Sequence, residues 1–430
     1  MIGSQPPGIY TRDDLIYALS LAAELEHGIC LQYLYAAYTL KTTADGLTPK
    51  QAAMVNQWET DILEIARQEM GHVGLVNNLL TAIGGSPHFH RPNFPQKDRY
   101  GKTNIQLQLK PLTLQTLQDF IAFETPQPPP KAKGIVATPV PTPFDYANIQ
   151  ALYQFIKEGF DRLEDKLGKK KIKETLFIGP PEAQIDSKRI GLRNERPIYD
   201  VKLSRVTNLK EARKAIEQIV EEGEGSRKGH DDSHFKRLKL IEKQYLRTER
   251  KFVPYRDVID NPATRENRLR WSDEANLITD PFTLKVAHLS NAAYEILLLT
   301  LIRFYGHIDA TEAELATLQY TSFFPLMVMV VRPAAELLST LPAGQELHGA
   351  KRAGPPFEFY GHVQLLPHRR SAWRVLYEKL DEMAVYCAEL AQEAKNSAKK
   401  EIHAAAPRLE FMRQNTRRIA NDFRSAMGVS

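Results

Sequence analysis

The sequence predicts an all-α protein whose N-terminal part is a four-helix bundle, and three observations predict it. Four segments carry apolar residues at helical spacing and begin with residues that favour helix N-termini: 12–39, 48–83, 208–222 and 231–247. Short connections join the first two segments and the last two, so each pair should form an antiparallel hairpin. Helical patterns continue to residue 427, which predicts additional C-terminal helices.

Signals at the helix ends define the first hairpin. Thr11, followed by acidic residues, is a good N-cap for the first helix. Thr48 followed by Pro49 is a typical start for the second helix. Gly84 and Gly85 then end it.

A long proline-rich insertion, residues 86–207, separates the two hairpins. Within it we expect two shorter helices, over 113–123 and 146–167, and a few short strands. The chain therefore divides into a bundle over residues 1–250, which contains the insertion, and a C-terminal helical region over 251–430 that packs on the bundle.

Composition and charge exclude several classes of protein. Of 430 residues, 43% are apolar and 25% are charged, and the net charge is +5, which is too balanced for a typical nucleic-acid-binding face. The most apolar run, residues 323–331, is too short to span a bilayer. Two distant cysteines, Cys30 and Cys387, indicate a reducing compartment. With no signal peptide evident, we expect a cytoplasmic protein that binds neither nucleic acid nor membrane.

The second predicted helix places two ionisable side chains among its buried positions. Glu69 and His72 fall in phase with apolar residues such as Ile65 and Val76, so both should face the interior, one turn apart. Burying either group without a partner costs several kcal/mol. A Glu-x-x-His pair inside a helix bundle is an arrangement that binds metal.

The first and last helices carry matching residues. Glu26 is in phase with the apolar residues of the first helix, and Tyr33 lies two turns later on the same face. Asp231 and His234 open the last helix as an Asp-x-x-His pair, which repeats the arrangement with a shorter acid.

The third helix ends with two candidate acids. Glu224 follows the buried Val220 by one turn, so it is the better inward-facing residue. Glu221 falls in phase with Glu217 and Lys214, which form a solvent-exposed face. We therefore prefer Glu224 as the contribution of this helix.

Together the two hairpins predict a dinuclear metal site. Each hairpin supplies one acid from its first helix and an acid-x-x-His pair from its second, and the ligands would be Glu26, Glu69, His72, Glu224, Asp231 and His234. Two divalent cations would neutralise four carboxylates. Mixed carboxylate and imidazole ligands suit iron, with manganese as the alternative.

Each part of this set also has an ordinary explanation. A lone Glu-x-x-His pair is common on helix surfaces, and a single inward histidine is usually a hydrogen-bonded core residue. Glu26 could pair with Arg67 or a tyrosine, and Asp231 could simply cap its helix. A buried network of ion pairs would account for the whole set. Repetition of one arrangement in two hairpins favours the metal site over these alternatives.

Several short motifs carry a resemblance to a known family. They cover residues 24–27, 33–36, 68–72, 77–87, 220–225 and 233–235. Over residues 10–250 the chain resembles the ferritin-like domain of iminophenyl-pyruvate dimer synthases, a family that includes the enzymes that couple two tryptophan-derived imines in violacein and indolocarbazole biosynthesis. The resemblance implies a ferritin-like bundle and oxidative chemistry in specialised metabolism.

Two features qualify what the resemblance implies. Asp231 stands where such sites often have glutamate, and its shorter side chain would hold the second ion more weakly. Some relatives use haem, so haem stays open as a cofactor, although the sequence has no clear haem-attachment motif.

We therefore expect a non-haem di-iron oxidase or oxygenase that uses O2 on a small, amino-acid-derived organic substrate. Tyr33 is the candidate catalytic residue, as a donor of a hydrogen bond or an electron, although an ordinary core tyrosine is the alternative. The charged C-terminal helices could also pair subunits in a homo-oligomer. The alternatives are a metal-handling or peroxide-scavenging protein and a scaffold protein with a degenerate site.

Overall fold

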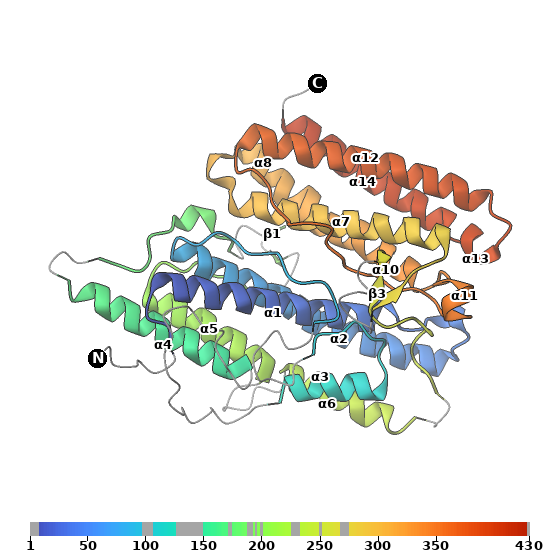
Figure 1. Ribbon diagram of the computed structural model, residues 1–430, viewed down its shortest axis with the longest axis horizontal. Helices are drawn as coiled ribbons and strands as arrows, with labels where there is room; N and C mark the ends of the chain where they lie inside the picture. The colour runs from blue at the N-terminus through green and yellow to red at the C-terminus, as the bar shows by residue number, and fades with distance from the viewer. Residues whose placement is uncertain are drawn as a thin grey trace.

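The computed structural model describes residues 8–96, 106–125, 149–170, 174–186, 192–193, 196–197, 201–224, 233–248, 252–266 and 275–427. Within these ranges the chain is mostly helical, and the helices form three layers (Figure 1).

The middle layer is a hairpin of two long helices, α1 (Arg12–Tyr38) and α2 (Pro49–Ala82), with the 3-10 turn η1 (Thr43–Asp45) between them. Thr11 and Thr48 cap the two helices in capping boxes, as expected. Gly84 follows α2 with a φ of +83°, a conformation that favours glycine. Both faces of the hairpin are covered, so α1 is buried throughout residues 21–38.

Four shorter helices cover one side of this hairpin: α3 (Leu114–Phe123), α4 (Ile149–Gly168), α5 (Leu209–Glu224) and α6 (His234–Tyr245). Helix α4 packs against α1 and α5, and α5 packs against α2, while α3 pairs with α6 toward the other end of the hairpin. The bundle is therefore present, but its second half is made of two pairs of short helices. Two of these helices, α3 and α4, lie in the insertion, close to the helices that the sequence predicts over 113–123 and 146–167.

The remaining helices cover the opposite side of the hairpin (Figure 1). Three of them are long: α7 (Pro281–Tyr305), α12 (Arg369–Lys395) and α14 (Ala406–Ala426). A segment of short helices packs between these long helices and α1. It consists of η4 (His307–Asp309), α8 (Glu312–Ala316), the π-helical η5 (Thr317–Phe323), α9 (Phe324–Leu326), the π-helical η6 (Met327–Val331) and α10 (Arg332–Leu338). Helices α11 (Gln345–His348) and α13 (Lys400–His403) are single turns.

Strands are short, as expected. In the insertion, β1 (Leu192–Arg193) pairs antiparallel with β2 (Arg196–Pro197), after the 3-10 turn η2 (Pro181–Ala183). In the C-terminal part, β3 (Pro262–Ala263) pairs in parallel with β4 (Asn276–Leu277).

One helical stretch, Ala313–Leu338, is long and apolar enough to cross a membrane when judged by length and composition. Its most apolar window is 50% buried inside the protein, and its π-helical parts pack against α7 and α14. Core helices of globular proteins share these properties, so the stretch is weak evidence for a membrane span.

Candidate metal centre

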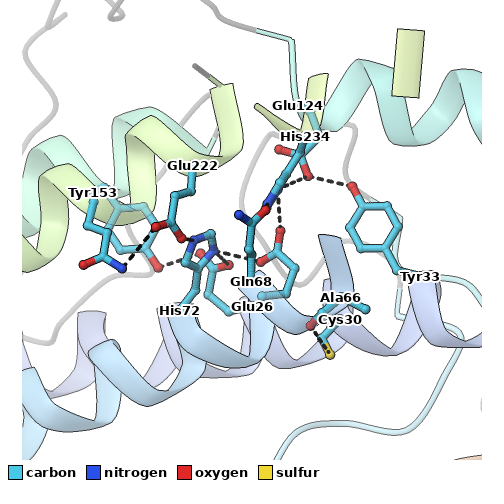
Figure 2. Close-up of polar contacts among 12 residues, drawn as sticks. Glu26, Cys30, Tyr33, Ala66, Gln68, His72, Glu124, Tyr153, Glu222 and His234 are labelled. Carbon is cyan, nitrogen blue, oxygen red and sulfur yellow. Dashed lines mark hydrogen bonds and ion pairs between the residues drawn. The ribbon is translucent and has the colours of Figure 1, made fainter. Parts of the chain in front are cut away.

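The candidate site lies where the layer of short helices, α3 to α6, meets the middle of the hairpin formed by α1 and α2. Six ionisable side chains converge there: Glu26 from α1, Glu69 and His72 from α2, Glu124 from the end of α3, Glu222 from the last turn of α5 and His234 from the start of α6. Figure 2 shows these side chains, with all but Glu69 labelled. Five of the six are buried and Glu222 is half-buried. The site therefore combines helix middles on one side with helix ends on the other.

Glu69 is shared between the two halves of the site. Its Oε2 lies 3.0 Å from Nδ1 of His72, and its Oε1 lies 3.0 Å from Nδ1 of His234. One carboxylate thus faces two imidazoles with its two oxygens, an arrangement suited to bridging two cations.

The first half contains Glu26, Glu69 and His72. His72 Nδ1 lies 3.5 Å from Glu26 Oε2, and its Nε2 lies 3.2 Å from Glu222 Oε2. The other oxygen of Glu222 accepts a hydrogen bond from the Gln218 amide at 3.2 Å. One oxygen or nitrogen atom each of Glu26, Glu69 and His72 lies within 4.8 Å of the others, close enough to hold one ion.

The second half contains Glu69, Glu124 and His234. Glu124 Oε1 lies 3.4 Å from His234 Nδ1, and these three residues form the second group whose ligand atoms lie within 4.8 Å of one another. The Nε2 of His234 is 2.9 Å from the Gln68 side-chain oxygen, a contact that orients the ring. Gly223 permits the close approach of α5, because a Cβ there would lie 3.2 Å from Glu124 Oε2.

Two tyrosines position the outer carboxylates. The Tyr33 hydroxyl donates a hydrogen bond to Glu124 Oε1, and the Tyr153 hydroxyl of α4 donates one to Glu26 Oε1, both at 2.6 Å. Each half of the site therefore has one buried tyrosine bonded to a carboxylate.

Electrostatics in the metal-free protein couple these groups. Burial raises the pKa of Glu26 to about 7, and the charge of Glu69 adds to this effect. Burial alone would also raise the pKa of Glu69, but the close positive charges of His72 and His234 and the hydrogen bond with His72 outweigh it and lower that pKa. Burial disfavours protonated imidazole, yet Glu124 and Glu69 raise the pKa of His234 to about 9, and Glu69 and its neighbours raise the pKa of His72 well above its ordinary value.

The donor set fits metal ions. His234 Nδ1 is buried and makes no hydrogen bond to a described residue, although carboxylate oxygens of Glu69 and Glu124 lie within 3.4 Å. Close contact without hydrogen-bond geometry is what a nitrogen and oxygens aimed at a common ion would show. Four carboxylates with two neutral imidazoles would balance the charge of two divalent cations, and oxygen with imidazole nitrogen suits iron or manganese.

The structure brings together four of the six ligands predicted from the sequence, Glu26, Glu69, His72 and His234, and their role as ligands stays a prediction. Helix α6 begins at His234 with Ser233 as N-cap, not at Asp231 as expected. Asp231 and the side chain of Glu224 lie outside the described residues.

Two acids at the site were missed, and both carried a signal in the sequence. Glu124 follows Leu117 and Phe120 at helical spacing, and both of these residues are buried. Glu222 follows the buried Ala215 and Ile219 in the same way. In each case the helix face extended to the last turn or to the cap, where sequence periodicity is weakest.

Replacement of Glu222 by glutamine should weaken metal binding by about tenfold or more, because the carboxylate that contacts His72 loses its charge. Glu221→Gln is the matched control, since Glu221 is the adjacent residue and is exposed. Titration of each variant with Fe(II) under anaerobic conditions would measure the change. Equal affinities for the two variants would remove Glu222 from the site.

Metal affinity should rise with pH up to about 9. In the metal-free protein the raised pKa values keep His72 and His234 protonated at neutral pH, and a metal ion must displace these protons. The expected slope is roughly tenfold in affinity per pH unit for each proton displaced. The same ion pairs stabilise the metal-free fold below pH 6.5, and His234's share is lost as pH rises through about 9. Metal titrations and melting curves between pH 6 and 9 would test both trends.

The chain is similar to known proteins in sequence and in fold. A family model described as Ferritin-like matches residues 19–243. Dichlorochromopyrrolate synthase of Lentzea aerocolonigenes is 28% identical over 420 residues, which cover 88% of this chain and 39% of that protein. The 2-imino-3-(indol-3-yl)propanoate dimerase of Chromobacterium violaceum is 24% identical over 380 residues, which cover 82% of this chain and 34% of that protein.

A solved structure of a ferritin-like protein from Caulobacter vibrioides is 20% identical, with a TM-score of 0.48, and the match covers 81% of this chain and 100% of that one. The matches to the synthase and the dimerase, in contrast, cover less than half the length of those two proteins.

Proposed function

Because this chain belongs to the ferritin-like family, we propose that it is an O2-dependent oxidase or oxygenase with two iron ions at the Glu69 site. The observation that carries the proposal is the position of Glu69, whose two oxygens face His72 and His234. Glu26 and His72 would hold one ion with Glu69, and Glu124 and His234 would hold the other. Glu222 would complete the set beside His72.

Reduced iron pairs supply electrons to O2, and the protein's own residues prepare the site for that chemistry. Tyr33 and Tyr153 hold Glu124 and Glu26 in place through 2.6 Å hydrogen bonds. Tyr33 is also close enough to the second half of the site to serve as the catalytic donor. Because its pKa is raised by burial and by Glu124, it keeps its proton at neutral pH.

Space for a small reactant lies directly beside the carboxylates. A cavity of about 30 Å³ is lined by residues of α3, α4 and α5, including Phe123, Gln150 and Val220. This volume holds a diatomic molecule or the reacting part of a substrate, while the rest of a larger substrate would extend between the helix ends. The names of the two curated relatives describe a synthase and a dimerase of an amino-acid-derived imine. We propose an amino-acid-derived organic substrate for this chain as well.

Oxygen uptake tests the proposal. The protein is loaded with Fe(II) without oxygen and mixed with O2 in the presence of oxidised amino acids generated in the cuvette. Substrate-dependent O2 consumption with an organic product is the expected result. Metal-free protein in the same mixture is the control.

Two other outcomes would assign a different function. If no candidate substrate changes the rate of O2 uptake and oxidised iron is the only product, the protein handles metal or removes peroxide. If the protein takes up no iron or manganese at all, it is a scaffold with a degenerate site. Metal handling stays the second candidate function because small ferritin-like bundles of that class have the same set of carboxylate and histidine ligands.

A further inference from the structure

A second cavity lies on the opposite face of the long hairpin from the metal centre. It has a volume of about 120 Å³ and sits between α1 and α2 on one side and α7, η5 and η6 on the other. On α1 its lining residues are His27, Cys30, Leu31, Leu34 and Tyr38, whereas Glu26 and Tyr33 face the metal centre. The two sites therefore share a wall but not a space.

The size of the cavity and the atoms that line it select a ligand. Protein interiors keep few voids larger than a water molecule, so a void of this size in a well-packed core is unusual. An apolar cavity of roughly 150 Å³ stays dry and accepts benzene. Here the wall is apolar and rich in aromatic rings, among them Phe89, Tyr294, Phe304 and Phe357. Such rings pack against another ring edge-to-face or in an offset stack.

The polar groups at the wall are neutral, and several of them are hydrogen-bonded, although His27 Nδ1 is buried and makes no hydrogen bond to a described residue. The Tyr294 hydroxyl and His27 Nε2 share a hydrogen bond, and Thr300 donates to the carbonyl of Ile296. Burial, reinforced by the charge of nearby Arg91, lowers the pKa of His27 well below its ordinary value, so its ring is uncharged at neutral pH. A charged ligand would lose its hydration without gaining a counter-ion at this wall.

The wall opposite the hairpin has unusual backbone. The π-helical segments η5 and η6 each end two residues before a proline, Pro325 and Pro333. Proline lacks an N–H and crowds the preceding turn, which favours a widened helix, and π-helical turns occur often at functional sites. Leu301 and the adaptable Met327 line the cavity and are only partly buried, as is Phe323, so this part of the wall lies near the protein surface.

We propose that this cavity is a binding site for a neutral molecule with a single aromatic ring, separate from the metal centre. We base this site on its volume, its aromatic wall, the π-helical segments and the absence of a charged group among the described lining residues, and it does not depend on the iron proposal.

Titration of the protein with benzene and phenol tests the proposal, with benzoate as the charged control. Saturable one-to-one binding of benzene and phenol, with a raised melting temperature, is expected, and benzoate should have no effect. Leu301→Trp should fill part of the cavity, because Leu301 lines it, and weaken benzene binding by at least about tenfold. Leu284→Trp is the matched control, because Leu284 is a partly buried leucine on the same helix that does not line the cavity.

A crystal soaked with bromobenzene locates the ligand even if Leu301→Trp fails to fold. An anomalous bromine peak among Phe89, Tyr294 and Phe304 supports the proposal. The proposal is overturned if neither benzene nor phenol binds saturably, if bromine is found only elsewhere, or if the two tryptophan variants bind benzene equally.

Discussion

Replacing Glu69 by glutamine is expected to remove both metal ions from the protein. Glu69 is the one carboxylate common to both groups of ligand atoms, and glutamine keeps its shape while removing the charge. The affinity at each position should fall by more than about a hundredfold, the upper end of what the loss of a supporting residue costs. Metal analysis after iron loading and desalting would measure the loss.

The control for Glu69→Gln is Glu64→Gln on the same helix. Glu64 pairs with Arg67 at the surface, and its side chain is 26% exposed. This variant should bind metal as the wild type does. If Glu69→Gln retains two ions per chain, the ions are held by residues other than this cluster, which is then a buried ion-pair network, and the oxidase proposal fails with the proposed site.

Replacing Glu124 by glutamine is expected to remove one ion and leave the other. Glu124 contacts only the His234 half of the site, and the first half retains Glu26, Glu69 and His72. The Tyr33 hydroxyl can still donate to the amide oxygen, so the local structure should persist. Metal content should fall from two ions to one, and substrate-dependent O2 consumption should be lost.

Asp119→Asn on the same helix is the control for Glu124→Gln, since Asp119 is partly exposed and accepts a hydrogen bond only from Gln115 among the described contacts. A Glu124→Gln protein that still binds two ions tightly would exclude Glu124 as a ligand. Asp231, the acid favoured by sequence reasoning, would then return as the candidate for that position.

Much of the fold was predictable because its signals are local. The match of residues 19–243 to the ferritin-like model confirms the predicted fold class and the resemblance. Caps at Thr11 and Thr48 and the glycine after α2 set the ends of the long hairpin. Glu69 and His72 were found because α2 is long and its core-facing positions repeat regularly.

The rest depends on contacts between distant segments. Helix α1 is covered on both faces, so its periodicity could not separate Glu26 from its neighbours Glu24 and His27. In the structure the side chains of Glu24 and His27 lie on the other face of α1. There Glu24 Oε1 lies 3.1 Å from His88 Nε2, and His27 Nε2 shares a hydrogen bond with the Tyr294 hydroxyl. Glu124 belongs to the site because α3 ends beside the start of α6. Helical periodicity within either segment does not predict that these two helix ends lie together.

The break in the second half of the bundle divides the centre into a rigid part and an adjustable part. Glu26, Glu69 and His72 stand in the middle of helices of 27 and 34 residues, so they move only if the whole hairpin moves. Glu124, Glu222 and His234 stand at helix termini, which a change of one residue in a connecting segment can rotate or withdraw. Related chains could therefore acquire new reactivity by altering loop lengths at this junction while leaving the hairpin untouched.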